Sequence, residues 1–136
     1  MKTNYFSNNE LHLLDASLQE KVNMWYLRDE ILNPVREQLG SISCTSGHRG
    51  KSHNTRVGGA ETSHHLCQDG FAAVDLLPQK CSLEVLFEYI RDNFSYAELI
   101  LEHDQGVVHV SCNIDPKKNA KRTSMRKVVN GKKVYY

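Results

Sequence analysis

Apolar residues recur at helical spacing through the first forty residues of the chain. Residues 7–10 (Ser-Asn-Asn-Glu) match a capping box. Apolar positions follow them at spacings of three and four: Leu11, Leu14, Leu18 and Val22. Residues 19–39 continue the pattern, with Pro34 expected to kink or restart the helix and Gly40 expected to end it. We therefore predict that this region is helical and buries that apolar face.

Shorter apolar runs follow and favour strands. Residues 71–77 form one run that Pro78 stops, and residues 97–103 and 107–112 predict a hairpin. Between them Ser82 can cap an amphipathic helix with the apolar face Leu83, Leu86, Phe87 and Ile90. A short strand is expected at 41–45 and a small hairpin at 128–135, over Asn130-Gly131. The order predicts an α+β domain in which N-terminal helices pack on a small, mainly antiparallel sheet.

Charge divides the chain into an acidic body and a basic C-terminal tail. Residues 1–112 carry 9 Lys+Arg against 15 Asp+Glu, a net charge of −6, whereas residues 113–136 carry 8 against 1, a net charge of +7. We expect a domain over residues 1–115 and a partly docked tail over residues 116–136. Such a tail can bind nucleic acid or an anionic cell wall. A solvated tail that offsets the acidic body is favoured, so a nucleic-acid partner is not expected.

Composition places the chain among ordinary globular domains. Its 136 residues are 40% apolar and 24% charged, with no apolar run long enough to span a membrane. The N-terminal residues lack the apolar core of a signal peptide, so synthesis in the cytoplasm is expected. Four widely spaced cysteines without a CxxC pair are expected to be free thiols.

Residues 46–75 concentrate the side chains that could do chemistry. Arg49, His65 and Asp75 fall in this stretch together with three further histidines. Its Gly, Ser, Asn and Thr content, without a helical period, predicts a long loop that runs into an apolar strand. A long loop inside a small domain is functional or disordered, and the histidines favour function.

Three residues of the chain have the chemistry of a zinc site. A catalytic zinc is held by three His or carboxylate ligands with one position left open, and His65, Asp75 and His109 supply such a set. Asp75 interrupts an apolar strand, where a carboxylate is costly unless it is paired or bound to a metal. His64 adjoins His65, so at most one of the two is expected to be a ligand.

The predicted hairpin adds a candidate general base. If Gln105-Gly106 is a two-residue turn, Glu102 lies opposite His109, with Cβ atoms roughly 4.5–5.5 Å apart. An acid beside a metal ligand is well placed to take a proton from an activated water. A three-residue turn would instead pair Glu102 with Val108, and Glu98 and Glu102 could both simply lie on the solvated face of a strand.

Short motifs then occur in the order typical of one peptidase family. The first half contains Phe6-Ser7-Asn8-Asn9-Glu10-Leu11, Ile31-Leu32-Asn33-Pro34-Val35-Arg36, Ser46-Gly47-His48-Arg49 and Val57-Gly58-Gly59. The second half contains Ser63-His64-His65, Ala73-Val74-Asp75, Leu99-Ile100-Leu101-Glu102 and Val107-Val108-His109-Val110-Ser111. Together they resemble the zinc D-Ala-D-Ala carboxypeptidases of the hedgehog/DD-peptidase type, and in particular the small domains of that family in phage lysis and virion proteins.

The resemblance implies a function and a role for each candidate residue. His65, Asp75 and His109 would hold zinc, Glu102 would act as general base, and Arg49 and Ser63 would contact the substrate. The enzyme would be a zinc metallopeptidase that cleaves peptidoglycan stem peptides, as a D-Ala-type carboxypeptidase or endopeptidase. It would act on the cell wall after release from the host cytoplasm, or as a virion component in contact with phage structural proteins.

Departures from the family pattern define an alternative. The family has seven positions from His to Asp, whereas His65 and Asp75 are ten apart, so three residues must loop out for the site to close. Gly106 stands where relatives often carry an acid, and Cys67 could compete for the metal. The alternative function is a catalytically inactive structural or virion module that keeps the fold.

Overall fold

The computed structural model describes residues 3–58, 63–119, 125–130 and 132–135. The helical elements are α1 (Leu18–Leu27), the π-helix η1 (Arg28–Leu32), α2 (Asn33–Leu39), α3 (Lys51–Arg56), the 3-10 turn η2 (His64–Leu66), α4 (Leu83–Asn93) and the 3-10 turn η3 (Pro116–Lys118). The strands are β1 (Ile42–Ser46), β2 (Phe71–Pro78), β3 (Glu98–Glu102), β4 (Val107–Asn113), β5 (Met125–Val129) and β6 (Lys132–Tyr135).

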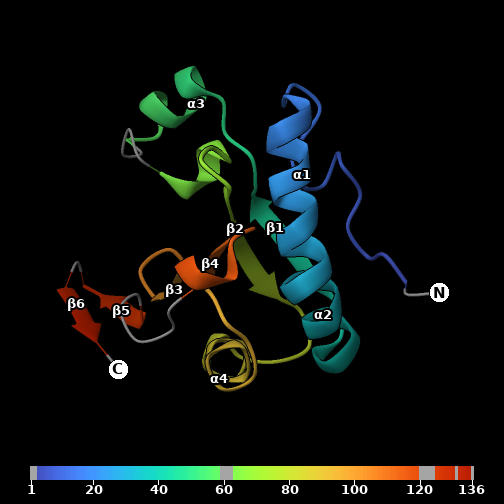
Figure 1. Ribbon diagram of the computed structural model, residues 1–136. Helices are drawn as coiled ribbons and strands as arrows, with labels where there is room; N and C mark the ends of the chain where they lie inside the picture. The colour runs from blue at the N-terminus through green and yellow to red at the C-terminus, as the bar shows by residue number, and fades with distance from the viewer. Residues whose placement is uncertain (1–2, 59–62, 120–124, 131, 136) are drawn as a thin grey trace.

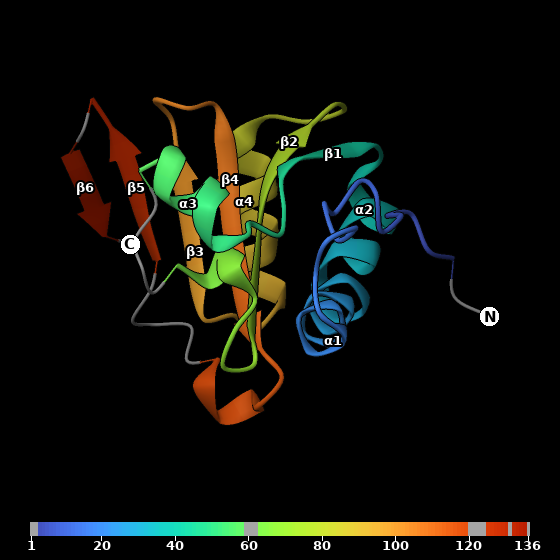
Figure 2. The same cartoon turned by 90° about the horizontal axis from the view of Figure 1, so that it is seen from above.

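The strands form one sheet in the order β1-β2-β4-β3-β5-β6. β3 and β5 pair in parallel, and the other neighbouring pairs are antiparallel. Figure 1 shows α3 and α4 on opposite sides of this sheet, and in Figure 2 α4 lies behind the strands and α3 in front of them. The predicted α+β fold, with helices on a mainly antiparallel sheet, is confirmed.

Alternation along the three central strands separates a core face from a site face. The core face carries apolar residues that pack with α1, α2 and α4: Ala72, Val74, Leu76, Leu99, Leu101, Val108, Val110 and Cys112. The residues between them point to the other side of the sheet, because successive side chains of a strand alternate. Asp75, Glu98, His109 and Ser111 therefore share the face that α3 and η2 cover.

The N-terminal helix begins later than its apolar pattern predicts. Ser17 makes the complete capping box with Glu20, and α1 starts at Leu18. The predicted box at residues 7–10 caps only a turn, in which the Glu10 N–H donates to Ser7 Oγ. The predicted apolar face is therefore wrong: Leu11 is buried in the segment before the helix, whereas Leu14 is 70% exposed and Leu18 72% exposed.

Pro34 divides the long helix as predicted. The chain passes from α1 through the π-helix η1 before α2 restarts at Asn33, whose N–H donates to the Arg28 carbonyl oxygen. Proline has no N–H to donate, and the wider π turn accommodates this interruption within a continuous helical path. Gly40, at φ 85°, ends α2, because a left-handed backbone conformation favours glycine.

The basic C-terminal segment adds β5 and β6 to the edge of the sheet. β5 pairs with β3, and β6 pairs with β5 in the predicted hairpin, where Val129 is the partner of Lys132. Gly131 of the predicted Asn-Gly turn and Gly59 of the Gly-Gly pair lie outside the described residues. The division at residue 115 stays a prediction. None of the helices in the described ranges has both the length and the apolar character that crossing a bilayer requires.

Candidate metal centre

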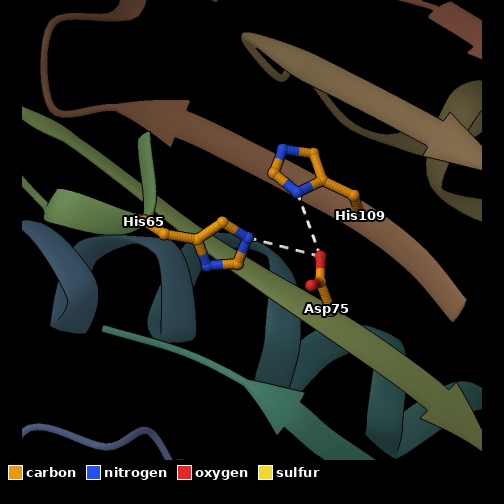
Figure 3. Close-up of side chains that lie close together, drawn as sticks. All are labelled: His65, Asp75 and His109. Carbon is orange, nitrogen blue, oxygen red and sulfur yellow. Dashed lines mark hydrogen bonds and ion pairs between the residues drawn. The ribbon is translucent and has the colours of Figure 1, made fainter. Parts of the chain in front are cut away.

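Three side chains meet on the site face of the sheet. His65 Nε2 and His109 Nδ1 both face Asp75 Oδ1, at 3.4 Å and 3.0 Å respectively, as Figure 3 shows. The ligand atoms of the three residues all lie within 4.8 Å of one another, and all three residues are buried. Asp75 and His109 are direct partners in the β2–β4 ladder, whereas His65 reaches them from η2.

Four hydrogen bonds hold the His65 segment over the sheet. The His65 Nδ1–H donates to the Gly47 carbonyl oxygen at 2.8 Å, because a carbonyl can only accept, and this leaves Nε2 directed at Asp75. The backbone of His65 donates to Ser63 Oγ and accepts from the Arg49 N–H. Asn23, buried on α1, donates from Nδ2 to the carbonyl oxygen of Cys67. The ring is therefore oriented by Gly47, and the segment that carries it is tied to two other parts of the chain, residues 47–49 and α1.

The ten-residue spacing between His65 and Asp75 is accommodated by a compact turn. η2 ends at Cys67 in a left-handed conformation, and Asp69 and Gly70 also have positive φ before β2 begins. The Phe71 N–H donates to the Gln68 carbonyl oxygen and closes this turn. We call His65, Asp75 and His109, which could hold a metal ion, the metal-binding group. Cys67 packs into the hydrophobic core and does not belong to this group.

Charge pairing dominates the electrostatics of the group. Burial by itself would raise the pKa of Asp75, but hydrogen bonds from His109 and His65 outweigh it and hold that pKa below its usual range. Burial would lower the pKa of His109, but its contacts with two carboxylates, Asp75 and Glu98, raise it to about 9. Burial lowers the pKa of His65 and keeps this imidazole neutral, the form that binds metals.

A pH dependence of stability follows for the metal-free protein. The pKa of His109 rises from 6.5 when unfolded to about 9 when folded, so its stabilising contribution is full below pH 6.5 and is lost as the pH rises towards 9. We expect the free energy of unfolding to fall by up to ~3 kcal/mol across this window. Urea unfolding in the presence of a chelator measures it. A His109→Gln variant should lack the fall, and a wild-type chain that also lacks it would contradict the assignment.

The two separations between Asp75 and the histidines match the geometry of a zinc site. Two ligands held about 2.0–2.1 Å from a tetrahedral zinc lie about 3.3 Å from each other. The nitrogen-to-oxygen separations of 3.4 Å and 3.0 Å bracket this value. Two imidazoles and one carboxylate are also the type of ligand set found in catalytic zinc sites. His65, Asp75 and His109 are therefore the residues that would hold the metal.

Arg49 lies beside the metal-binding group, next to an open hollow. Its Nη2 is 3.5 Å from Asp75 Oδ2, and its Nε donates to Ser46 Oγ. The hollow has a volume of about 560 Å³, and its lining includes Thr45, Ser46, Arg49, Asp75, Gln105 and Val107. Ser63 is placed differently: its Oγ caps η2 by accepting the His65 N–H. A substrate contact for either residue stays a prediction.

The predicted pairing of Glu102 with His109 is wrong. Glu102 pairs with Val107 across a four-residue turn, and His109 pairs with Ile100. The turn is longer than expected because Gly106 adopts φ 71° and its N–H donates a hydrogen bond to the Glu102 carbonyl oxygen, which closes a four-residue turn. Glu102 is consequently a diagonal neighbour of His109 on the same face, and Glu98 is the diagonal neighbour on the other side. Glu102 as general base stays a prediction.

Sequence reasoning missed several residues that complete the site. Glu98 and Ser111 were placed only as strand residues, although period-two alternation puts both on the face of His109. No sequence signal distinguishes Asn23 from other helix residues or identifies the Gly47 carbonyl as the partner of His65. Those contacts join segments that are far apart in the chain.

The sheet thus carries a buried His-Asp-His group that could hold a metal ion, and this group lies beside an open hollow. The family model described as Peptidase M15 matches residues 4–111, and the chain belongs to this family of zinc-dependent metallopeptidases. The family expected from the sequence motifs is therefore confirmed. No curated protein matches the chain.

Proposed function

We propose that the protein is a zinc-dependent peptidase that cleaves stem peptides of bacterial peptidoglycan, with the bond next to a D-Ala residue as its target. The observation that carries the proposal is the buried group of His65, Asp75 and His109 in a chain of the peptidase M15 family. The adjoining hollow gives a peptide a place to lie against Asp75.

Arg49 supports a substrate that carries a carboxylate. Its guanidinium group lines the hollow within 3.5 Å of Asp75, so it is held close to the metal-binding group. Guanidinium groups bind carboxylates through parallel hydrogen bonds, which fix position as well as provide attraction. The C-terminal D-Ala carboxylate of a stem peptide offers such a partner. Ser63, which begins the same segment as His65, is the second proposed substrate contact.

The metal and the side chains have separate roles in the proposed reaction. Zinc, when held by His65, Asp75 and His109, would supply a Lewis acid able to polarise the peptide carbonyl and to lower the pKa of water. Glu102 is the proposed general base: it pairs with Val107, which lines the hollow, and it shares the face of His109. Its carboxylate would take the proton of the attacking water and pass it to the leaving amine.

Release of D-Ala from a stem peptide ending in D-Ala-D-Ala tests this activity. We expect the zinc-loaded protein to cleave this peptide or intact peptidoglycan, and a chelator to stop the reaction until zinc is restored. New amino groups in digested peptidoglycan, without free D-Ala, would indicate an endopeptidase. Zinc binding without cleavage of either substrate would favour the alternative of a catalytically inactive structural or virion module.

Replacing Glu102 by Gln should reduce kcat/KM by about 10²–10⁴-fold, the usual contribution of a general base. The amide keeps the shape of the side chain but cannot accept the proton. Zinc content should stay at the wild-type value, because Glu102 is not among the three ligands. Glu88→Gln on the exposed face of α4 is the matched control. Unchanged activity in Glu102→Gln would remove it from this role.

The biological setting that we propose is lysis of a bacterial host by a phage, or entry through its cell wall as a virion component. The support is the similarity of the motifs to small phage domains of this family. Peptidoglycan is then the partner of the enzyme, reached after release from the host cytoplasm. We expect the purified protein to clear a suspension of bacterial cell walls, and we expect Glu102→Gln to lose this activity.

A further inference from the structure

The imidazole of His109 is contacted on both of its nitrogens. Nδ1 faces Asp75, whereas Nε2 lies 3.0 Å from Glu98 Oε1 on the opposite side of the ring. Figure 3 shows this second nitrogen pointing away from the metal-binding group. Glu98 therefore cannot reach the reacting atoms directly, and any influence on the site passes through His109.

Glu98 is itself held by two further side chains. Its Oε1 lies 3.0 Å from His64 Nδ1 and accepts from Ser111 Oγ at 3.4 Å. His64 Nδ1 and Ser111 Oγ are hydrogen-bonded to each other at 2.8 Å. The ring of His64 stacks on Phe71 with centroids 3.9 Å apart and planes 5° apart, which fixes its orientation. The carboxylate oxygen therefore has a defined position beside His109.

A carboxylate at this position selects one tautomer of His109. A neutral imidazole has one N–H and one free nitrogen, and an ionised carboxylate can only accept. With the proton on Nε2 donated to Glu98, Nδ1 is left to bind a metal between Asp75 and His65. Carboxylates that accept the second N–H of a metal-binding histidine fix the ring and make it a stronger ligand.

We propose that Glu98, oriented by His64 and Ser111, is a positioning residue that keeps the proton of His109 on Nε2 and thereby presents Nδ1 to zinc. The inference rests on the proposed zinc site and deepens it. His64 and His65 then have different roles. His65 faces Asp75 within the metal-binding group, whereas His64 contacts Glu98 on the far side of the His109 ring. It also separates the two acids of β3, with Glu98 acting on the metal ligand and Glu102 on the water.

Zinc affinity, measured by competition with a chromophoric chelator, tests the role of Glu98. We expect Glu98→Ala to weaken zinc binding by about 10–100-fold, the usual effect of removing such a partner. Glu98→Gln keeps an oxygen that accepts the His109 N–H and should stay much closer to the wild type. His64→Ala should give a smaller loss than Glu98→Ala, and Glu88→Ala is the control on an exposed surface.

The tautomer itself is visible by ¹⁵N NMR of the imidazole rings in the zinc-loaded wild type. The expected spectrum shows His109 protonated on Nε2 and bound to zinc through Nδ1. The opposite assignment would overturn the inference even if Glu98→Ala fails to fold. Equal zinc affinity in the wild type and a folded Glu98→Ala would also overturn it, while leaving the zinc site intact. A wild-type chain without zinc affinity would instead overturn the proposed function.

Discussion

Replacing His109 by Ala is expected to remove zinc from the protein and to abolish peptidase activity. The imidazole is one of the three proposed zinc ligands, and it also pairs with Asp75 at 3.0 Å. Without it, the metal would be held by two residues, fewer than the three that catalytic zinc sites use. We expect about one zinc per chain in the wild type and only a residual amount in the variant after dialysis. Activity should fall by about 10³-fold or more, because the Lewis acid contributes several kcal/mol to the barrier.

Metal content by atomic emission, measured beside the rate of peptide cleavage, checks this prediction. His65→Ala provides a second test from a different segment, because its ring reaches Asp75 from η2 and not from the sheet. His103→Ala is the matched control, since that histidine contacts Glu84 and lies outside the metal-binding group. Circular dichroism confirms that each variant folds. Full zinc occupancy in both folded ligand variants would show that the metal binds elsewhere.

Among single substitutions in the loop that covers the site, Gly47→Ala should destabilise the protein most. A Cβ at residue 47 would lie 2.2 Å from the carbonyl oxygen of Leu11 and 2.8 Å from its carbonyl carbon. Backbone atoms cannot yield as a flexible side chain can, so the two segments must separate. The same carbonyl accepts the His48 N–H, and that contact would be strained too. We expect a loss of about 2–3 kcal/mol in the free energy of unfolding.

Zinc affinity should fall in the same variant. The Gly47 carbonyl oxygen accepts the Nδ1–H of His65, and its displacement would release the ring from its orientation towards Asp75. Gly50→Ala is the matched control in the same loop, because a Cβ there meets nothing within 4 Å. Chemical unfolding of the metal-free proteins compares the two. Equal stability of the two variants would show that residues 11 and 47 are not packed as described.

Local pattern was sufficient for most elements of the fold. The apolar run that becomes β2, the helix capped by Ser82 and the two-stranded hairpin were all predicted within a few residues of their observed bounds. These features depend on alternation, helical periodicity and capping, which involve residues close together in the sequence. There were two exceptions. In α1, two capping sequences, at Ser7 and Ser17, competed and the later one begins the helix. In the stretch predicted to be a long loop, Lys51–Arg56 form the short helix α3.

The details that decide the chemistry could not be predicted in the same way. The turn between β3 and β4 has four residues, and this length places His109 opposite Ile100 and between two diagonal acids. This turn also contacts a distant part of the chain, since Asp104 accepts the Asn130 N–H from the terminal hairpin. A two-residue change in turn length shifts every pairing along the ladder, so a local estimate of turn length cannot identify the partner of His109.

The sequence by itself determined the set of donors, the α+β class and the family, because residue types, periodicity and ordered motifs are properties of neighbouring positions. Tertiary structure alone decided that His65 closes onto Asp75 across ten residues, that Glu98 contacts His109, and that Asn23 and Gly47 hold the loop in place. These contacts join residues 10 to 44 positions apart, and they exist only once the sheet, the helices and the loop have packed together. Their geometry is set by the summed packing of the core, which no single segment of the sequence encodes.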